Sequence, residues 1–106
     1  VHFQAIGSDW NLEKSISVAL YRICQELLNN ILKHAEASQI QVQLVKDENN
    51  ISLTVEDNGK GFDPNSVKLG AGLSSIRTRA EALGGSFDIQ SRLGEGSSFL
   101  VEITFA

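Results

Sequence analysis

One long stretch of helical periodicity constrains the fold more than any other feature of the sequence. Between about Leu12 and Ala35, an apolar residue recurs every three or four positions. The members of this stripe are Ile16, Ala19, Leu20, Ile23, Leu27, Leu28 and Ile31. The spacing predicts a single amphipathic helix, with Asp9 or Asn11 as its N-cap because either side chain can accept a hydrogen bond from a helix-start amide.

The other apolar residues follow patterns typical of strands and of one further helix. Alternation of apolar and polar residues predicts strands at residues 1–7, 39–45, 51–57, 86–92 and 98–106. In the first of these strands, Val1, Phe3 and Ala5 fall on one face. The segment "GLSSIRTRAEALGG" predicts a second helix, which ends at Gly84 or Gly85 as its C-cap. Its inward residues are expected to be Leu73, Ile76, Ala80 and Leu83.

This order of elements predicts one domain over residues 1–106, with an α+β two-layer sandwich fold. The sheet is expected to be mixed and largely antiparallel, with both helices packed on one face. Residues 58–71 are rich in glycine, contain the only proline and form a loop longer than most connections. This loop is therefore a candidate functional segment.

Composition narrows the class of protein and of partner. An apolar share of 42% and a charged share of 21% are ordinary for a globular chain, and no apolar run reaches the ~20 residues that span a bilayer. The net charge of −4 argues against nucleic-acid binding, and we expect no membrane contact by this domain. The lone Cys24 fits a reducing, cytoplasmic setting and is expected to be an inert buried thiol.

Polar residues on the long helix form the first candidate site. Glu26 and Asn30 are four residues apart in "ELLNN", so both project from one face, and Lys33 and His34 follow within the next turn. This combination can hold a hydrated metal ion and anionic oxygens, because Mg²⁺ needs few protein ligands when it also binds phosphates. A solvated polar face is the alternative, and it is favoured for Glu26 and Lys33 taken alone. The adjacent asparagines are harder to explain in that way, because Asn is a poor helix former.

Three glycine-bearing motifs follow along the chain. In "DNGKGF", Asp57 can accept a hydrogen bond from an exocyclic amine, while Gly59 and Gly61 allow backbone to approach a flat ligand; a plain hairpin turn is the alternative, favoured on "DNG" alone. "GAGL" precedes the second helix and can present its first amides to phosphate. "GEGSSF" by itself predicts only a hairpin turn with serines.

The four motifs in this order resemble those of the Bergerat-fold (GHKL) ATPases, which include gyrase B subunits, heat-shock chaperones, mismatch-repair proteins and sensor histidine kinases. "ELLNNILKHAEAS" and "GLSSIRTRAEALGGSFDIQSRLGEGSSF" look like the catalytic domain of histidine kinases of the nitrate/nitrite-sensor and DesK-like group. The resemblance runs from about residue 15 to the end of the chain, and it implies the Bergerat version of the α+β sandwich.

The resemblance also implies a role for each motif residue. Asn30 would coordinate Mg²⁺ that bridges the ATP phosphates, and Glu26 would act as general base or polarise the acceptor. Asp57 would bind the adenine amino group, beside the backbone of Gly59 and Gly61. The other residues expected at the nucleotide are Lys33, His34, Gly70, Gly72, Leu73 and Ser97. Ser97 stands where the family usually has threonine, and residues 62–69 correspond to a short ATP lid.

The implied activity is that of a protein-histidine kinase of a two-component system. The domain would bind Mg-ATP and donate the γ-phosphoryl group to a histidine on a separate dimerisation domain, with a response regulator downstream. His2 and His34 do not have the surroundings of a phosphoacceptor, so the domain alone should not autophosphorylate. Two alternatives remain at this point: a protein-serine kinase of the anti-sigma-factor type, and a degenerate, nucleotide-free interaction module.

Overall fold

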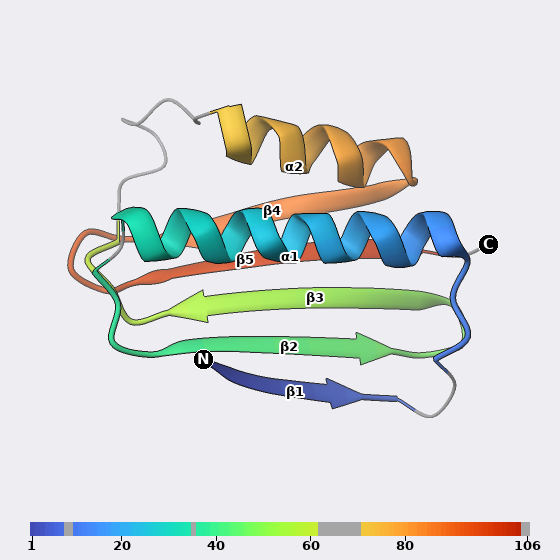
Figure 1. Cartoon of the computed structure of the whole chain (residues 1–106), viewed down its shortest axis with the longest axis horizontal. Helices are drawn as coiled ribbons and strands as arrows, with labels where there is room; N and C mark the ends of the chain where they lie inside the picture. The colour runs from blue at the N-terminus through green and yellow to red at the C-terminus, as the bar shows by residue number, and fades with distance from the viewer. Residues whose placement is uncertain (8–9, 35, 62–70, 105–106) are drawn as a thin grey trace.

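The computed structural model describes residues 1–7, 10–34, 36–61 and 71–104. The predicted order of strands and helices is confirmed (Figure 1). The elements are β1 (His2–Ile6), α1 (Lys14–His34), β2 (Ile40–Lys46), β3 (Asn50–Asp57), α2 (Ala71–Ala82), β4 (Gly85–Ser91) and β5 (Ser97–Thr104).

The strands form one sheet in the order β1-β2-β3-β5-β4. β1 runs parallel to β2, and every other neighbouring pair is antiparallel. Figure 1 shows α1 and α2 in front of the same face of this sheet. The prediction of a mixed, largely antiparallel sheet with helices on one face is therefore confirmed.

The core lies between that face and the two helices. Alternate residues of β3 and β5 are buried, as expected for strands with one covered face. The buried apolar residues of α1 and α2 come from the predicted stripes and join those of β2 to β5 in one cluster. The fully buried side chains with the largest volumes are Ile23, Leu27, Ile51, Ile76, Ile103, Val55 and Val101.

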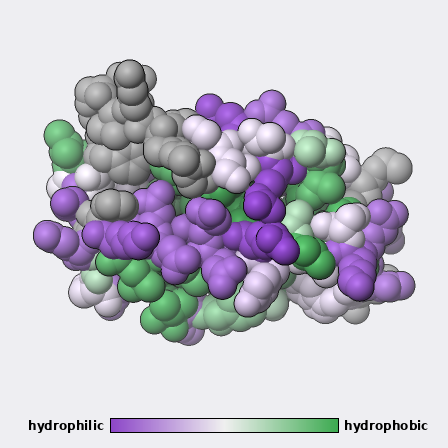
Figure 2. All heavy atoms as spheres, turned by 45° about the horizontal axis from the view of Figure 1, so that its top comes forward, coloured by the Kyte–Doolittle hydropathy of each residue, from purple (hydrophilic) through white to green (hydrophobic). Residues whose placement is uncertain are grey.

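β1 forms as predicted but does not share in the core. All five of its residues are exposed, and Phe3 retains 60% of its accessible surface. The reason is geometric, because α1 packs against β3 while α2 packs against β4 and β5, which leaves the β1 edge uncovered. Figure 2 shows hydrophilic residues across the middle of the helix-bearing side and a hydrophobic area below them.

The start of α1 differs from the prediction. The amides of Ile16 and Ser17 donate to the carbonyl oxygen of Glu13, so the helix begins there rather than at Asn11. Asp9, the other expected N-cap, lies outside the described residues. Leu12 packs against the core ahead of the helix, which accounts for the later start.

The end of α2 agrees with the prediction. Gly84 has a φ of +76°, and its amide donates to the carbonyl oxygen of Glu81. A glycine in this left-handed conformation is a common helix C-cap. Within the described part of the chain, neither helix is both long and apolar enough to span a membrane.

Candidate functional site

Three polar side chains end the sheet in one row. The register pairs Asp57 at the end of β3 with Ser97 at the start of β5, and Ser97 with Ser91 at the end of β4. Directly opposed residues project from the same face of a sheet. Asp57 follows the buried Val55 by two positions, so this row lies on the helix-bearing face. Figure 1 shows that α1 ends at the same edge of the sheet, which makes this edge the candidate site.

Asp57 carries the most distinctive chemistry of the site. Its side chain is buried, with 9% of its surface accessible. Oδ1 accepts a hydrogen bond of 2.8 Å from the amide of Gly59, whereas Oδ2 is buried without a partner among the described residues. Leaving a buried carboxylate oxygen unpaired costs free energy, and native proteins rarely do so without a reason. The atom is suited to accept a hydrogen bond from a ligand.

Asn58 holds Asp57 in place from the other side of the strand end. Its Oδ1 accepts hydrogen bonds from the amides of Ser38 at 3.0 Å and Gln39 at 2.9 Å. Its Nδ2 donates to the Ser38 hydroxyl at 2.8 Å, and its own amide donates to the Gln39 carbonyl at 3.2 Å. Asn58 therefore fastens the end of β3 to the segment that leads into β2. Sequence reasoning did not select it, because "DNG" is also an ordinary turn.

Replacing Asn58 with alanine should lower the free energy of unfolding by about 1–2 kcal/mol, because the three side-chain hydrogen bonds are lost while water can still reach the exposed groups. Urea denaturation of the two chains measures this difference. Asn49→Ala, at an exposed position of the β2–β3 turn, is the matched control and should change stability by no more than about 0.5 kcal/mol. Equal effects of the two substitutions would show that the side-chain hydrogen bonds of Asn58 do not stabilise the end of β3.

The "DNGKGF" and "GEGSSF" segments cross each other at close range. A Cβ on Gly61, which has a φ of +64°, would overlap the carbonyl oxygen of Arg92. A Cβ on Gly96, with a φ of +79°, would overlap the carbonyl oxygen of Asp57. The amide of Gly94 donates to the carbonyl of Lys60 at 2.6 Å. The close contact between the two turns is enough to explain why residue 61 is glycine, without a ligand. The buried Gly59 instead supplies the amide that bonds the Asp57 side chain.

Ser97 is buried and forms a hydroxyl pair with its cross-strand neighbour. The two Oγ atoms of Ser97 and Ser91 are 2.8 Å apart, and Ser91 Oγ also donates to the carbonyl of Gly96 at 3.1 Å. Ser97 was expected at the site, whereas nothing in the sequence motifs pointed to Ser91. Only the pairing of β4 with β5 brings them together.

The α1 residues predicted for the site are found in its last three turns. Glu26 and Asn30 are both half-buried and share one side of the helix, and Lys33 is exposed. Among the described residues, no group of three or more His, Cys, Asp or Glu is close enough to cage a metal ion. Any ion here would take most of its ligands from a bound anion and water.

Some predicted site residues cannot be placed fully. Gly70, the predicted lid at 62–69 and the side chain of His34 lie outside the described residues. Gly72 and Leu73 belong to the first turn of α2, and Leu73 is buried. Their backbone amides are thus among those that a helix N-terminus leaves for other acceptors.

Cys24 and Arg77 lie outside the candidate site. Cys24 is half-buried, and this burial raises the pKa of its thiol, so it stays protonated and unreactive at neutral pH. Arg77 lies over the ring of Phe87, with its guanidinium carbon 5.8 Å from the ring centroid.

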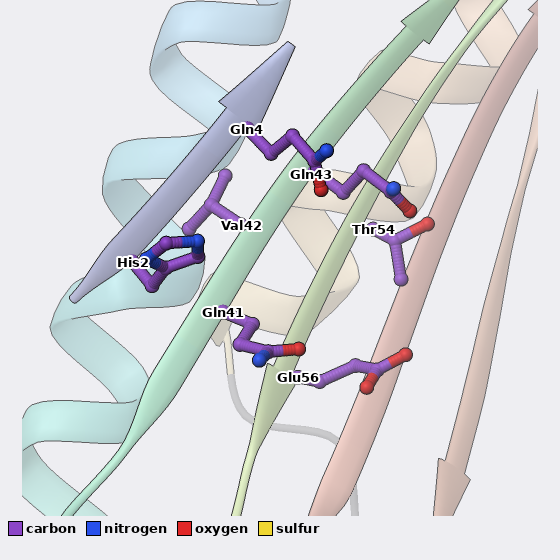
Figure 3. Close-up of a pocket in the computed structure, with 7 residues that line it drawn as sticks. All are labelled: His2, Gln4, Gln41, Val42, Gln43, Thr54 and Glu56. Carbon is purple, nitrogen blue, oxygen red and sulfur yellow. The ribbon is translucent and has the colours of Figure 1, made fainter. Parts of the chain in front are cut away.

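A separate shallow pocket of about 140 Å³ lies on the opposite face of the sheet (Figure 3). Its polar lining comes from neighbouring strands, and Figure 3 shows Gln41 and Glu56 side by side within it. The lining residues are His2, Gln4, Gln41, Val42, Gln43, Thr54 and Glu56. None of them belongs to the sequence motifs, so this pocket and the Asp57 row are distinct.

The sequence model of one protein family matches most of the chain. It covers residues 15–106 and is described as "Histidine kinase-, DNA gyrase B-, and HSP90-like ATPase". Among solved structures, a histidine kinase domain from the Erythrobacter litoralis EL346 blue-light activated histidine kinase superposes with a TM-score of 0.75. The match covers 96% of this chain and 53% of that one at 20% identity, so it shows a shared fold.

Several relatives of known name are similar in sequence over nearly the whole chain. The signal transduction histidine-protein kinase/phosphatase DegS of Bacillus subtilis is 35% identical over 97% of this chain, and LiaS, a sensor histidine kinase of the same organism, is 35% identical over 94%. UhpB of Salmonella typhimurium, also a signal transduction histidine-protein kinase/phosphatase, is 41% identical over 81%. The chain spans only 28%, 29% and 18% of these three proteins, respectively.

Proposed function

The chain belongs to the histidine kinase-, DNA gyrase B- and HSP90-like ATPases, and on this basis we propose that it binds Mg-ATP at the Asp57 edge of the sheet. The observation that carries the proposal is the buried Oδ2 of Asp57, which has no partner among the described residues. A nucleotide fits this atom because adenine offers an exocyclic amino group as a donor. Family membership supports the choice of ATP as that nucleotide.

The base would be recognised at the end of β3. Asp57 Oδ2 would accept a hydrogen bond from the 6-amino group, while Gly59 keeps the carboxylate oriented through Oδ1. The Ser97 hydroxyl lies in the same row and would face the same end of the base. The backbone crossing at Gly61 and Gly96 would hold these groups rigidly, which lowers the cost of ordering them on binding.

The phosphates would lie beside the last turns of α1 and the first turn of α2. Asn30 would hold Mg²⁺ through its side-chain oxygen, and bound Mg²⁺ would neutralise charge on the phosphate oxygens. Lys33 and His34 would lie near the phosphates, where Lys33 would add positive charge, and the amides of Gly72 and Leu73 would donate to phosphate. Gly70 would close the lid in front of the nucleotide.

The proposed reaction is phosphoryl transfer to a histidine of a separate dimerisation domain in the same parent kinase. Glu26 would act on the acceptor, by removing its proton or by polarising the ring. The named relatives are histidine kinases, which supports this acceptor and a response regulator downstream. Catalysis would be chiefly positioning and charge stabilisation. We place the domain in the cytoplasm, where ATP is available.

Calorimetric titration with a non-hydrolysable ATP analogue tests the magnesium part of this proposal. Native chain should bind the analogue more tightly with Mg²⁺ than without it. Asn30→Ala should lose at least about tenfold in the affinity measured with Mg²⁺, because a metal ligand is removed, and should retain most of the affinity measured without it.

Asn29→Ala is the matched control, since Asn29 is the exposed neighbour of the half-buried Asn30. This variant should bind like the native chain under both conditions. If native chain failed to bind ADP or the analogue at millimolar concentration, the nucleotide assignment would be wrong. Equal losses in the two asparagine variants would remove Asn30 from the metal site.

A further inference from the structure

We propose that Ser91 is a positioning residue for base selection: it turns the Ser97 hydroxyl away from Asp57, so that the site presents only hydrogen-bond acceptors to the 6-position of a purine. This inference rests on the proposed nucleotide function and adds a residue that no sequence motif contains. It predicts that the site selects a 6-amino purine over a 6-oxo purine through a side chain that does not touch the base.

The hydrogen bonds of the serine pair indicate a direction for both protons. A serine hydroxyl has one proton to donate and two lone pairs that accept. Ser91 Oγ donates its proton to the Gly96 carbonyl at 3.1 Å. The distance of 2.8 Å between the two Oγ atoms allows either to donate, and the bond of Ser91 to Gly96 assigns the donor role to Ser97. The Ser97 proton is thus directed toward β4, which leaves its lone pairs for the rest of the site.

The consequence for Asp57 follows from the register. Asp57 and Ser97 are directly opposite each other on β3 and β5, and the Cβ atoms of such pairs lie about 4.5–5.5 Å apart. Oδ2 has no partner among the described residues while Ser97 bonds Ser91, so Ser97 would reach the carboxylate only after a change of its χ1 rotamer. It would then satisfy Oδ2. Ser91 prevents this internal bond and so keeps the acceptor available.

A site with two acceptors distinguishes donors from acceptors on its ligand. Adenine presents an amino group at its 6-position, which matches Asp57 Oδ2. Hypoxanthine presents an oxo group at the same position, and two oxygens facing each other leave both unsatisfied. A site built to receive a hydrogen-bond donor therefore rejects the analogue that lacks it. Inosine diphosphate (IDP) differs from ADP at this edge of the base only, which makes it a direct probe.

The test is calorimetric titration of ADP and IDP into native chain, Ser91→Ala and Ser91→Thr. Ser91→Ala should weaken ADP binding by about tenfold and reduce the ratio of ADP to IDP affinity by at least about fivefold, because the Ser97 proton becomes free to bond Asp57. Ser91→Thr retains a hydroxyl and should restore the ratio. A general loss of structure would weaken both ligands equally and leave the ratio unchanged.

Two further variants separate the route of the effect from a loss of stability. Added to Ser97→Ala, the Ser91→Ala substitution should cause no further change in the ratio, since Ser91 acts through Ser97. Ser98→Ala, on the same strand but the opposite face, should bind like the native chain. Ser91→Cys, with a weakly bonding thiol of similar shape, takes the place of Ser91→Ala if that variant does not fold.

The possible results distinguish a failure of the proposed role of Ser91 from a failure of the nucleotide site on which it rests. Native chain that binds neither diphosphate overturns both. Native chain that prefers ADP, with a preference that Ser91→Ala leaves intact, overturns the role of Ser91 and leaves the nucleotide site standing. A reduced ratio that Ser91→Thr restores supports the role of Ser91.

Discussion

Replacing Asp57 with asparagine should weaken ADP binding by at least about 100-fold. In one orientation of the new amide, its nitrogen takes the place of Oδ2. In the other, its nitrogen takes the place of Oδ1, and the hydrogen bond from the Gly59 amide is lost. The substitution changes one acceptor into a donor that faces the adenine amino group, while the shape of the side chain is nearly conserved. Folding should be little affected, because the asparagine oxygen can still accept from the Gly59 amide. Calorimetry gives the affinity, and urea denaturation of the ligand-free chain gives the stability.

Glu56→Gln is the control for charge alone. Glu56 precedes Asp57 in β3 but is exposed on the opposite face of the sheet. Its neutralisation should leave ADP binding within about twofold of native, because the charge is exposed to solvent and lies on the far face. A Glu56→Gln loss as large as that of Asp57→Asn would mean that net charge, and not a specific hydrogen bond, governs binding. Unchanged binding in Asp57→Asn would contradict the adenine assignment.

Gly96→Ala should lower the free energy of unfolding by about 3 kcal/mol or more. The new Cβ would overlap the carbonyl oxygen of Asp57, and the φ of +79° is unfavourable for any residue with a side chain. Neither atom in this overlap can move independently, since Asp57 belongs to the paired end of β3 and Gly96 directly precedes the paired Ser97 of β5. Urea denaturation measures the loss, and nucleotide binding should weaken with it.

Gly94→Ala separates the cost of the steric overlap from the cost of a positive φ. Gly94 lies in the same turn with a φ of +81°, but a Cβ there would meet no atom within 4 Å. It should therefore cost only the conformational penalty, about 1 kcal/mol. If Gly96→Ala cost no more than Gly94→Ala, the two turns would not be in close contact, and the rigid crossing that supports Asp57 would be wrong.

The sequence predicted the elements well because hydrophobic periodicity is a local signal. The spacing of apolar residues on α1 and the alternation in β3 and β5 recur as buried positions in the structure. Two features depend on tertiary packing, which no local pattern shows. Leu12 packs against the core ahead of the start of α1, and β1 stays exposed because neither helix extends over it.

The candidate site was only partly predictable for the same reason. Asp57 and Ser97 belong to motifs that can be seen in the sequence, and the structure places them opposite each other. The contact of Gly61 with Arg92 and the hydroxyl pair of Ser91 and Ser97 depend on strand register. Register is set by side chains far apart in the chain, so no local pattern could show these contacts.

A nucleotide should bind at the Asp57 edge of the sheet. The most direct test is a titration of ¹⁵N-labelled chain with ADP, followed by amide chemical shifts. The largest shifts are expected at residues 57–61 and 94–97 and near the end of α1, with the Gly59 amide strongly affected because it bonds Asp57. Largest shifts at Gln4, Gln43 and Thr54, in the pocket on the opposite face, would contradict this expectation, as would the absence of any shift at saturating ADP.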